Sequence, residues 1–374
     1  MKLPRRTLLR ISSTAVVLAA CRPSATPTAT PAPAAKPTEA GAPKPAAAAT
    51  KPAAAPKPGG ARKKLVFGSP VTPPSMVHLP PSVALEMGYF EEQELDLEVK
   101  SFEGGVGALR AGLSGGLDVV GTSADPLIAA VAQNAPVKAI GAYAPRLSVV
   151  LTTQAGITNV EDLKGKKIGI QDVGGFNEVM VRLLLATKGL KPSDVQYVNI
   201  TTAGRVPGLV SGQIDASVLH IDQYYNATKQ KPDLVALAKM WEIAPDWWYS
   251  AYVASDQQIK ENRDALIGFL TATTKAGRSM YKDKAKTVEI GVKHTKQPED
   301  VVARAYDDLA KGGIWTVNDG MPEKSVLYTI DKQVEIGTIK PEQKPSLDKL
   351  IDRSLIDEAV KRNGGPMTGD PRWY

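Results

Sequence analysis

Short apolar segments alternate with helical segments from Lys63 onward, and this alternation restricts the possible folds more than any other feature. Strand-like patterns cover residues 63–70, 95–103 and 117–123, and helical patterns cover residues 82–90, 105–115 and 125–134. Strands separated by helices are typical of βαβ units, whose strands run parallel within a buried sheet. The sequence therefore predicts an α/β fold.

The same alternation starts again later in the chain. Strand-like segments cover 166–172, 195–200 and 216–220, and helical segments cover 177–189 and 222–230. From about 257 to 363, amphipathic helical patterns dominate instead. We therefore expect two α/β portions that are followed by a helical portion.

A segment of the first portion recurs in the second. Positions 112–125 and 209–222 share identical residues in one register: Ser114, Gly115, Asp118 and Asp125 recur as Ser211, Gly212, Asp215 and Asp222. In each copy, glycine after serine suits the left-handed residue that ends a helix. A buried strand follows, and the second aspartate is expected to cap the next helix. All βαβ units resemble one another somewhat, but the matched register favours two related lobes.

Two α/β lobes that face each other create a cleft. Open α/β sheets bind ligands at the carboxyl ends of their strands. In the two copies these ends carry Thr122-Ser123 and Leu219-His220. We therefore expect a binding site between the lobes.

The N-terminus has the features of an export signal. Residues 1–20 contain four basic and no acidic side chains, followed by a short apolar run and then Cys21. Such a segment is typical of a secretory signal peptide. Residues 18–21 resemble a bacterial lipobox, in which Cys21, the chain's single cysteine, is lipidated. Arg5-Arg6 leaves twin-arginine and general secretion both open.

Residues 21–62 are predicted to be a disordered tether. Ala and Pro make up 25 of the 41 residues from 22 to 62, and such a composition cannot bury enough apolar surface to fold. The tether contributes +5 and the signal segment +4 to the net charge of +7, which leaves −2 for residues 63–374. The basic excess therefore gives no support to nucleic-acid binding. We expect a monomeric extracytoplasmic domain that a lipid on Cys21 anchors to the cell membrane.

Glycine-rich turns precede two of the expected helices, at 102–109 and 171–179. Free N–H groups at a helix N-terminus suit a carboxylate, sulfonate or phosphate, although tight packing accounts for these glycines equally well. Neither turn is a dinucleotide or P-loop fingerprint, because Arg110 stands where a third glycine is needed and no Gly-Lys-Ser/Thr follows.

The motif Gly-x-Ser-x-Gly at 112–116 does not predict a nucleophile. A nucleophile elbow joins a strand to a helix, whereas here a helix precedes Ser114 and a strand follows it. The three histidines match no metal-ligand spacing. His78 and His220 fall at the predicted lobe rims, where each is either a ligand contact or a histidine satisfied within the core, and His294 lies on a lysine-rich helix and is expected to be solvated.

Aromatic residues gather at the expected return crossing between the lobes. Trp247, Trp248 and Tyr249 lie between the second portion and the strand-like segment after it. Large aromatic side chains at such a hinge can stack on a flat ligand or simply pack the seam between lobes. Both interpretations remain open.

The segment 76–99 resembles the substrate-binding proteins of ABC importers for nitrate, sulfonates, taurine and thiamine-pyrimidine precursors. The resemblance is carried by His78, Pro80, Ala84, Gly88, Tyr89 and Phe90 and by residues 95–98. Residues 159–170 are similar to the family's opening of the second lobe. Glu94 stands where the family has glycine, and Pro81-Ser82 replace an apolar-aromatic pair.

The resemblance implies a two-lobed periplasmic-binding-protein fold of type II, in which each lobe is a mostly parallel sheet flanked by helices. Residues 63–146 and 248–374 would form lobe 1 with the C-terminal helices, and residues 147–247 would form lobe 2. The family's cleft positions correspond to Thr72, Ser75, His78, Ser123, Asp125, Gly174, Gly175, Phe176, Asn177, His220, Asp222 and Trp248.

The expected function is capture of a small polar or anionic organic molecule, such as a sulfonate, nitrate, carboxylate or pyrimidine, and its delivery to an ABC permease. We expect no catalytic residue, no cofactor and no metal. The alternatives are a pyrimidine synthase of the same fold, a metal-dependent hydrolase, and a chemoreceptor partner or surface adhesin. The related synthase relies on a cysteine-rich motif, whereas this chain has only Cys21.

Overall fold

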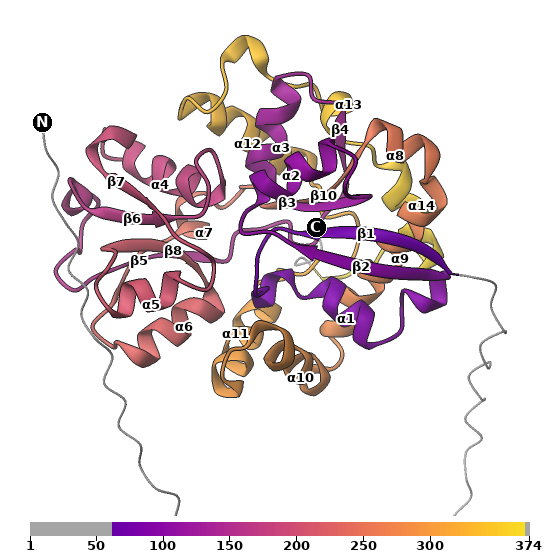
Figure 1. Cartoon of the computed structure of the whole chain (residues 1–374), viewed down its shortest axis with the longest axis horizontal. Coiled ribbons are helices and arrows are strands. Elements are labelled where there is room, and N and C mark those ends of the chain that lie inside the picture. The colour runs from indigo at the N-terminus through magenta and orange to yellow at the C-terminus, as the bar shows by residue number, and fades with distance from the viewer. Residues whose placement is uncertain (1–61, 371–374) are drawn as a thin grey trace, which may run out of the picture. The chain divides into compact units, whose positions relative to one another are not determined.

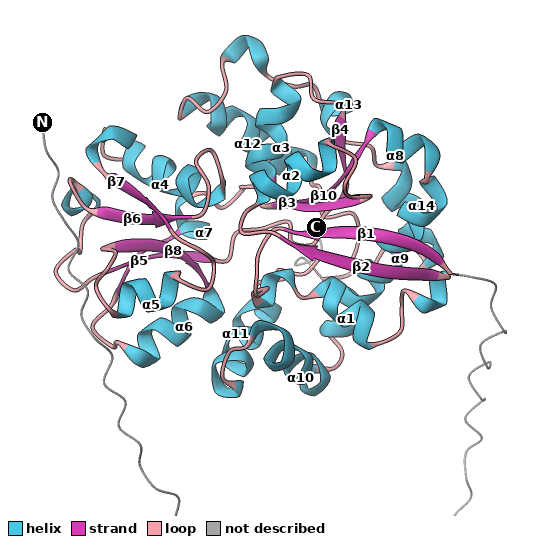
Figure 2. Cartoon of the chain, in the orientation of Figure 1, coloured by secondary structure: helices cyan, strands magenta, loops and turns pink. Residues whose placement is uncertain are grey.

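Two five-stranded β-sheets with helices packed around them form the part of the chain that the computed structural model describes, residues 62–370 (Figures 1 and 2). The predicted signal peptide, the lipidated Cys21 and nearly all of the tether lie outside the described residues. Within the described range, none of the helices is both long enough and apolar enough to cross a membrane.

The first sheet combines strands from two distant parts of the chain. Its spatial order is β2 (Leu95–Ser101), β1 (Lys63–Ser69), β3 (Val119–Ser123), β10 (Ser250–Ser255) and β4 (Val137–Gly141). β1 pairs in parallel with β2 and β3, whereas β10 runs antiparallel to β3 and β4.

The second sheet repeats this order. It runs β7 (Gln196–Asn199), β6 (Lys167–Ile170), β8 (Ala216–His220), β5 (Val149–Thr153) and β9 (Val235–Lys239). β6 is parallel to β7 and β8, and β5 is antiparallel to β8 and β9. In both sheets the antiparallel strand is the first strand after the chain crosses from the other sheet: β5 follows β4, and β10 follows β9. The predicted α/β class with mostly parallel sheets is confirmed.

Helices cover both faces of each sheet (Figure 1). Those that connect or cover the strands are α1 (Pro80–Glu86), α2 (Gly105–Leu113), α3 (Ala124–Ala132), α4 (Phe176–Ala186), α5 (Arg205–Val210), α6 (Ile221–Gln230) and α7 (Met240–Ile243). The helical C-terminal portion contains α8 (Asp256–Glu261), α9 (Arg263–Met280), α10 (Lys284–Thr295), α11 (Glu299–Lys311), α12 (Glu323–Glu335), α13 (Leu347–Leu350) and α14 (Ser354–Arg362). Short 3-10 turns cover Met76–His78, Glu91–Gln93, Val160–Leu163, Pro192–Asp194 and Pro341–Gln343.

The repeated segment ends a helix in the same way in both sheets. Ser114 follows the last residue of α2, and Ser211 follows the last residue of α5. The glycine after each serine has a positive φ, 80° at Gly115 and 76° at Gly212. L-residues with a Cβ rarely adopt this conformation, so the prediction of a left-handed helix end is confirmed.

The first repeated aspartate ties its strand to a neighbouring strand. Asp118 Oδ2 accepts the backbone N–H of Val66 at 2.7 Å, and Asp215 Oδ2 accepts the backbone N–H of Lys167 at 2.8 Å. In each case the aspartate N–H donates back to the carbonyl of the same partner residue. The sequence repeat therefore corresponds to a repeat of hydrogen bonds.

The expected role of the second repeated aspartate is wrong. Ser123 is the N-cap residue of α3 and His220 is that of α6, so Asp125 and Asp222 are the second residues of their helices. The chain passes from strand to helix without an intervening loop, because the last strand residue serves as the cap. The helix predicted over 82–90 likewise differs, since α1 begins at Pro80 and ends at Glu86.

Both sheets belong to one compact unit of the chain. A hydrophobic core with members such as Phe67, Trp248 and Ile168 runs continuously through it, and a smaller cluster around Leu209 and Ile214 packs beneath α5 and α6. The strands of the first sheet lie within 63–141 and 250–255, and those of the second lie within 149–239. The division into two lobes at 146/147 and 247/248 stays a prediction.

Candidate functional site

A small cavity of about 30 Å³ lies where the carboxyl ends of strands from both sheets meet. The first sheet supplies the residues that follow β1, β2, β3 and β4, and the second supplies those that follow β6 and β8. The lining residues are Pro70, Val71, His78, Gly104, Gly105, Ser123, Tyr143, Gln171, Asp172, Gly175, Phe176, Asn177, His220 and Tyr249. The expected position of the site, at the strand ends, is where this cavity lies.

Two histidines from opposite sheets meet at this cavity. The ring centroids of His78 and His220 are 5.0 Å apart, and the rings are nearly perpendicular. Ser75 Oγ lies 2.8 Å from His78 Nδ1, and the Tyr249 hydroxyl lies 3.2 Å from His78 Nε2. Both ring nitrogens of His78 are therefore held by neutral partners, which fixes the orientation of the ring.

Burial keeps both imidazoles neutral. Desolvation, together with the nearby positive charge of Arg205, lowers the pKa of His78 to about 3. The same causes and His78 lower the pKa of His220 well below its ordinary value. At neutral pH each ring thus has one donor nitrogen and one acceptor nitrogen and carries no charge.

Arg205 brings a buried positive charge to the same place. It begins α5 and is 1% exposed. Its Nη1 donates to the carbonyl of Val218 at 2.9 Å, whereas its Nε and Nη2 atoms have no hydrogen-bond partner. Burial lowers the pKa of Arg205 to about 10, and the Tyr249, Asp222 and Glu103 side chains oppose this decrease. Unpaired guanidinium donors are costly to bury, and an anion would satisfy them.

Two carboxyl groups lie under the cavity in equivalent places. Burial raises the pKa of Asp125 to about 7, and the pKa of Asp222 to about 6. The N–H groups at the starts of their helices oppose both increases, although neither carboxyl group is paired in good hydrogen-bond geometry. Each aspartate therefore holds a proton more readily than a solvated carboxylate does.

Polar contacts between the sheets close the cavity. Glu103 Oε2, which follows β2, accepts the backbone N–H of Thr202 at 3.0 Å. The Asp172 carboxyl group packs against Gly104 at the start of α2, where a Cβ would lie only 1.6 Å from Asp172 Oδ2. Burial raises the pKa of Asp172, and the N–H of Val106 opposes this increase. A side chain at position 104 would therefore displace the Asp172 carboxyl group from this contact.

Six of the predicted ligand-binding residues line the cavity. They are His78, Ser123, Gly175, Phe176, Asn177 and His220. Ser75, Asp125 and Asp222 are buried next to it, and Ser75 orients His78. Gly174 donates its N–H to Glu178 at 2.5 Å and, like Thr72, does not line the cavity. Whether any of these residues contacts a ligand stays a prediction.

The structure places Trp248 away from the cavity, so its predicted position is corrected. Its side chain is fully buried, its Nε1 donates to the Gly320 carbonyl at 3.2 Å, and its N–H donates to Thr329 Oγ1 at 2.7 Å. Tyr249 lines the cavity instead and contacts the Phe176 ring, with centroids 4.8 Å apart. Neighbouring residues of an extended segment point in opposite directions, so only one of the two aromatics can face the cleft.

Sequence reasoning missed several residues at this site, chiefly Tyr143, Arg205, Gln171 and Asp172. Tyr143 follows β4, and Arg205 begins the helix that comes after β7. The rule that ligands bind at strand carboxyl ends would have pointed to both. Within residues 62–370, no group of three or more His, Cys, Asp or Glu side chains is arranged to hold a metal ion.

Comparisons with known proteins match the region that holds this site. A family model described as NMT1/THI5 like matches residues 75–286. A binding protein of Brucella abortus (strain 2308) is 27% identical over 216 residues, which are 58% of this chain and 67% of that protein. The 4-amino-5-hydroxymethyl-2-methylpyrimidine phosphate synthase THI5 of Saccharomyces cerevisiae is 27% identical over 231 residues, which are 57% of this chain and 66% of that protein.

A solved structure has the same fold. The periplasmic aliphatic sulphonate binding protein SsuA of Escherichia coli superposes with a TM-score of 0.60 at 22% sequence identity, and the match covers 78% of this chain and 92% of that chain. The prediction of a periplasmic-binding-protein fold is therefore confirmed.

Proposed function

The chain belongs to the NMT1/THI5-like family, and on this premise we propose that it is an extracytoplasmic solute-binding protein. Its ligand is a small polar or anionic organic molecule, held between the two sheets in the cavity that His78, His220 and Tyr249 line. An ABC permease in the membrane receives the ligand. The sulphonate-binding and other binding proteins with similar sequence or fold support this proposal.

One observation carries the choice of an anionic ligand. Arg205 is buried beside the cavity with two guanidinium nitrogens unpaired, while His78 and His220 are neutral. An anion would therefore meet the positive charge of Arg205 and two neutral imidazoles in a site of low dielectric constant, where charge-assisted hydrogen bonds are strong. The raised pKa values of Asp125 and Asp222 reduce the negative charge that would oppose it. The class includes sulfonates, nitrate, carboxylates and pyrimidines with an anionic substituent.

The size of the cavity supports a mechanism of opening and closing. At about 30 Å³, it admits little more than one small group, so a ligand must enter while the two sheets are further apart. A ligand that contacts both sheets stabilises the closed state over the open one. Small-angle scattering should then show a smaller radius of gyration with bound ligand, and an unchanged radius despite proven binding would contradict this mechanism.

A thermal-shift titration with nitrate, methanesulfonate, taurine, acetate and an aminopyrimidine tests the function. A ligand at one hundred times its Kd stabilises the native state by about 2.7 kcal/mol, which raises the Tm by several degrees. We expect at least one of these compounds to raise the Tm of the wild type and to lose this effect in His220→Ala. Trp248→Phe is the matched control, which should keep the shift. No shift with any compound, or a shift unaffected by His220→Ala, would overturn the assignment.

The lipid anchor belongs to the same proposal. Cys21 lies outside the described residues, and its lipobox supports acylation. In cells fed a palmitate analogue, the wild type should be labelled and partition with membranes, whereas Cys21→Ser should be unlabelled and released. An unlabelled wild type would contradict the proposed lipid anchor and would leave the proposed binding site unaffected.

Enzyme activity is the second candidate, because the yeast relative is a pyrimidine phosphate synthase. Mass spectrometry of each ligand that raises the Tm separates the two candidates. We expect every ligand to be recovered unchanged after prolonged incubation, and a product that accumulates with time would favour the enzyme.

A further inference from the structure

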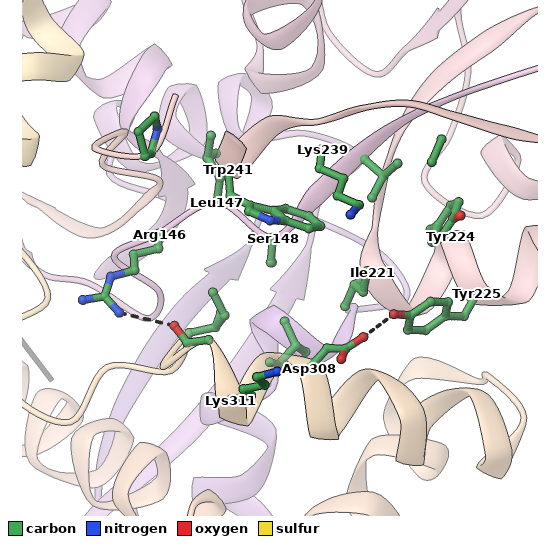
Figure 3. Close-up of a pocket in the computed structure, with 16 residues that line it drawn as sticks. Arg146, Leu147, Ser148, Ile221, Tyr224, Tyr225, Lys239, Trp241, Asp308 and Lys311 are labelled. Atoms are coloured by element: carbon green, nitrogen blue, oxygen red, sulfur yellow. Dashed lines mark hydrogen bonds between the residues drawn. The ribbon is translucent and has the colours of Figure 1, made fainter. Parts of the chain in front are cut away.

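A second cavity, which none of the predicted site residues lines, is much larger than the first. Its volume is about 530 Å³, within the range of about 300–1,000 Å³ that is typical of small-molecule sites. Figure 3 shows the residues around it. They come from the first crossing between the sheets, from the start of α6, from the segment around α7, and from the end of α11.

The two cavities lie on either side of the start of α6. His220 lines the first cavity, and Ile221, the next residue in the chain, lines the second. The two cavities have no lining residue in common among those described. A molecule in the second cavity would therefore not occupy the site proposed for the solute.

Apolar and aromatic side chains form most of the walls of the second cavity. Leu147, Ile221 and Ile314 are buried aliphatic residues of this wall, and Trp241 provides a large aromatic surface. In Figure 3, Trp241 and Lys239 lie on the side of the cavity opposite Asp308 and Lys311. Such walls favour a flat apolar body over a strongly polar one.

The charges around the second cavity are mainly positive. Arg146, Lys239 and Lys311 line it together with a single acidic lining residue, Asp308, and Lys239 also forms an exposed ion pair with Glu242 at 3.4 Å. The Asp308 carboxylate accepts a hydrogen bond from the Tyr225 hydroxyl, which partly satisfies it (Figure 3). The cavity therefore suits a molecule with one negative charge.

A buried hydroxyl in the same cavity lacks a partner. Ser148 lines the cavity and is 6% exposed, and its Oγ has no hydrogen-bond partner in the structure. A buried polar group without a partner destabilises the fold, because it has lost its hydrogen bonds to water. An acceptor on a bound molecule would remove this destabilisation.

From these features we propose that the second cavity binds a small aromatic carboxylate. The ring lies against Trp241 and the aliphatic wall, the carboxylate interacts with Lys239, and the Ser148 hydroxyl donates to a carboxylate oxygen. The site is separate from the solute site and adds a second ligand to the protein.

Calorimetric titration of the full chain with 2-naphthoate tests the proposal. We expect one binding site whose affinity falls at least tenfold in Ser148→Ala and in Lys239→Gln, and at least tenfold when neutral 2-naphthamide replaces the probe. His220→Ala, which changes a side chain that lines the cleft and not the second cavity, is the matched control and should keep the affinity. A cooperative thermal unfolding transition of each variant without probe establishes that it folds.

Two results would overturn the proposal. The first is the absence of 2-naphthoate binding at millimolar concentration. The second is binding that His220→Ala abolishes and that Ser148→Ala and Lys239→Gln leave intact, because the probe would then occupy the cleft. This second result would leave the proposed solute-binding function standing, and loss of solute binding would likewise leave the second site intact.

Discussion

Acidification should weaken this protein through His78 in a way that one substitution can isolate. The ring is buried between the two sheets, and its pKa in the folded state is lowered from 6.5 to about 3. When folding lowers the pKa of a group, the unfolded chain binds the proton more readily than the folded protein does. The folded state therefore loses stability at pH values where only the unfolded chain is protonated. For a histidine, the neutral buried ring therefore costs little at pH 7 and above, and stability falls as the pH decreases from 7 towards 3.

The size of this effect follows from the two pKa values. At pH 5 an unfolded histidine is about 97% protonated, whereas the buried ring is almost wholly neutral. Holding His78 neutral then lowers the free energy of unfolding by about 2 kcal/mol at pH 5, compared with about 0.2 kcal/mol at pH 7. His78→Gln removes the titrating ring, so this variant should gain about 2 kcal/mol relative to the wild type between pH 7 and pH 5.

Other titratable groups near His78 also change the stability with pH. The contribution of His78 is therefore measured as the difference between the wild type and a variant. His220 faces His78 and its lowered pKa acts in the same direction, whereas Asp125 and Asp222 have raised pKa values and stabilise the fold as the pH falls. Arg205 stays charged throughout this range. Because these groups are present in both proteins, their contributions largely cancel in the difference between the wild type and His78→Gln.

Urea unfolding followed by tryptophan fluorescence at pH 7 and pH 5 measures the difference. His294→Gln is the matched control, because His294 lies at the surface, with its Nε2 2.9 Å from Glu86 Oε1, so that its removal relieves no buried group. A difference between the wild type and His78→Gln that stays constant from pH 7 to pH 5 would refute the reasoning. It would mean that the ring is hydrated in solution and that the two sheets do not close around it.

Four further substitutions and one control test the proposed solute site. Arg205→Lys should weaken binding of an anionic ligand at least tenfold in calorimetry, because it removes the unpaired guanidinium donors. Arg278→Lys is the control and should leave the Kd unchanged, because the guanidinium nitrogens of Arg278 donate to backbone carbonyls. Trp248→Phe should lower the free energy of unfolding by about 1–3 kcal/mol without changing the Kd. Tyr249→Phe should raise the Kd, which titration with the same ligand measures. Glu103→Gln should weaken the contact with the other sheet and increase the radius of gyration measured by small-angle scattering in the absence of ligand.

The sequence predicted the parts of the fold that depend on local pattern. The repeated Ser-Gly and the first repeated aspartate correspond to the same helix end and the same strand contact in both sheets, since each needs only neighbouring residues and one adjacent strand. The position of the cap was predicted two residues too late. Serine and histidine at the strand ends adopt extended backbone and cap the helices themselves, and composition alone does not distinguish this from capping by the aspartate.

The site was harder to predict, because it depends on which way single side chains point. Trp248 and Tyr249 are adjacent aromatics that precede β10, and their backbone groups bond distant segments. The Trp248 N–H donates to Thr329 Oγ1, and the Tyr249 carbonyl accepts the N–H of Ala124, contacts that only the tertiary structure establishes. The burial of Arg205 could not be predicted from the sequence, since arginine is rarely buried. Its position depends on α5 packing at the end of β8, where Val218 accepts its hydrogen bond.

Polar contacts beside the cleft add to the continuous hydrophobic core that the two sheets share. Glu103 Oε2 accepts the Thr202 N–H, and α6 is joined to α11 by the Tyr225–Asp308 hydrogen bond and the Lys229–Asp300 ion pair. A hydrogen bond to a charged group contributes about 1.5–3 kcal/mol. A shift from 1% to 99% closed requires a ligand to favour the closed state by about 5.5 kcal/mol. An anion that satisfies the two unpaired donors of Arg205 and contacts residues of both sheets can supply a free energy of that order, so the ligand itself would decide whether the cleft is open or closed.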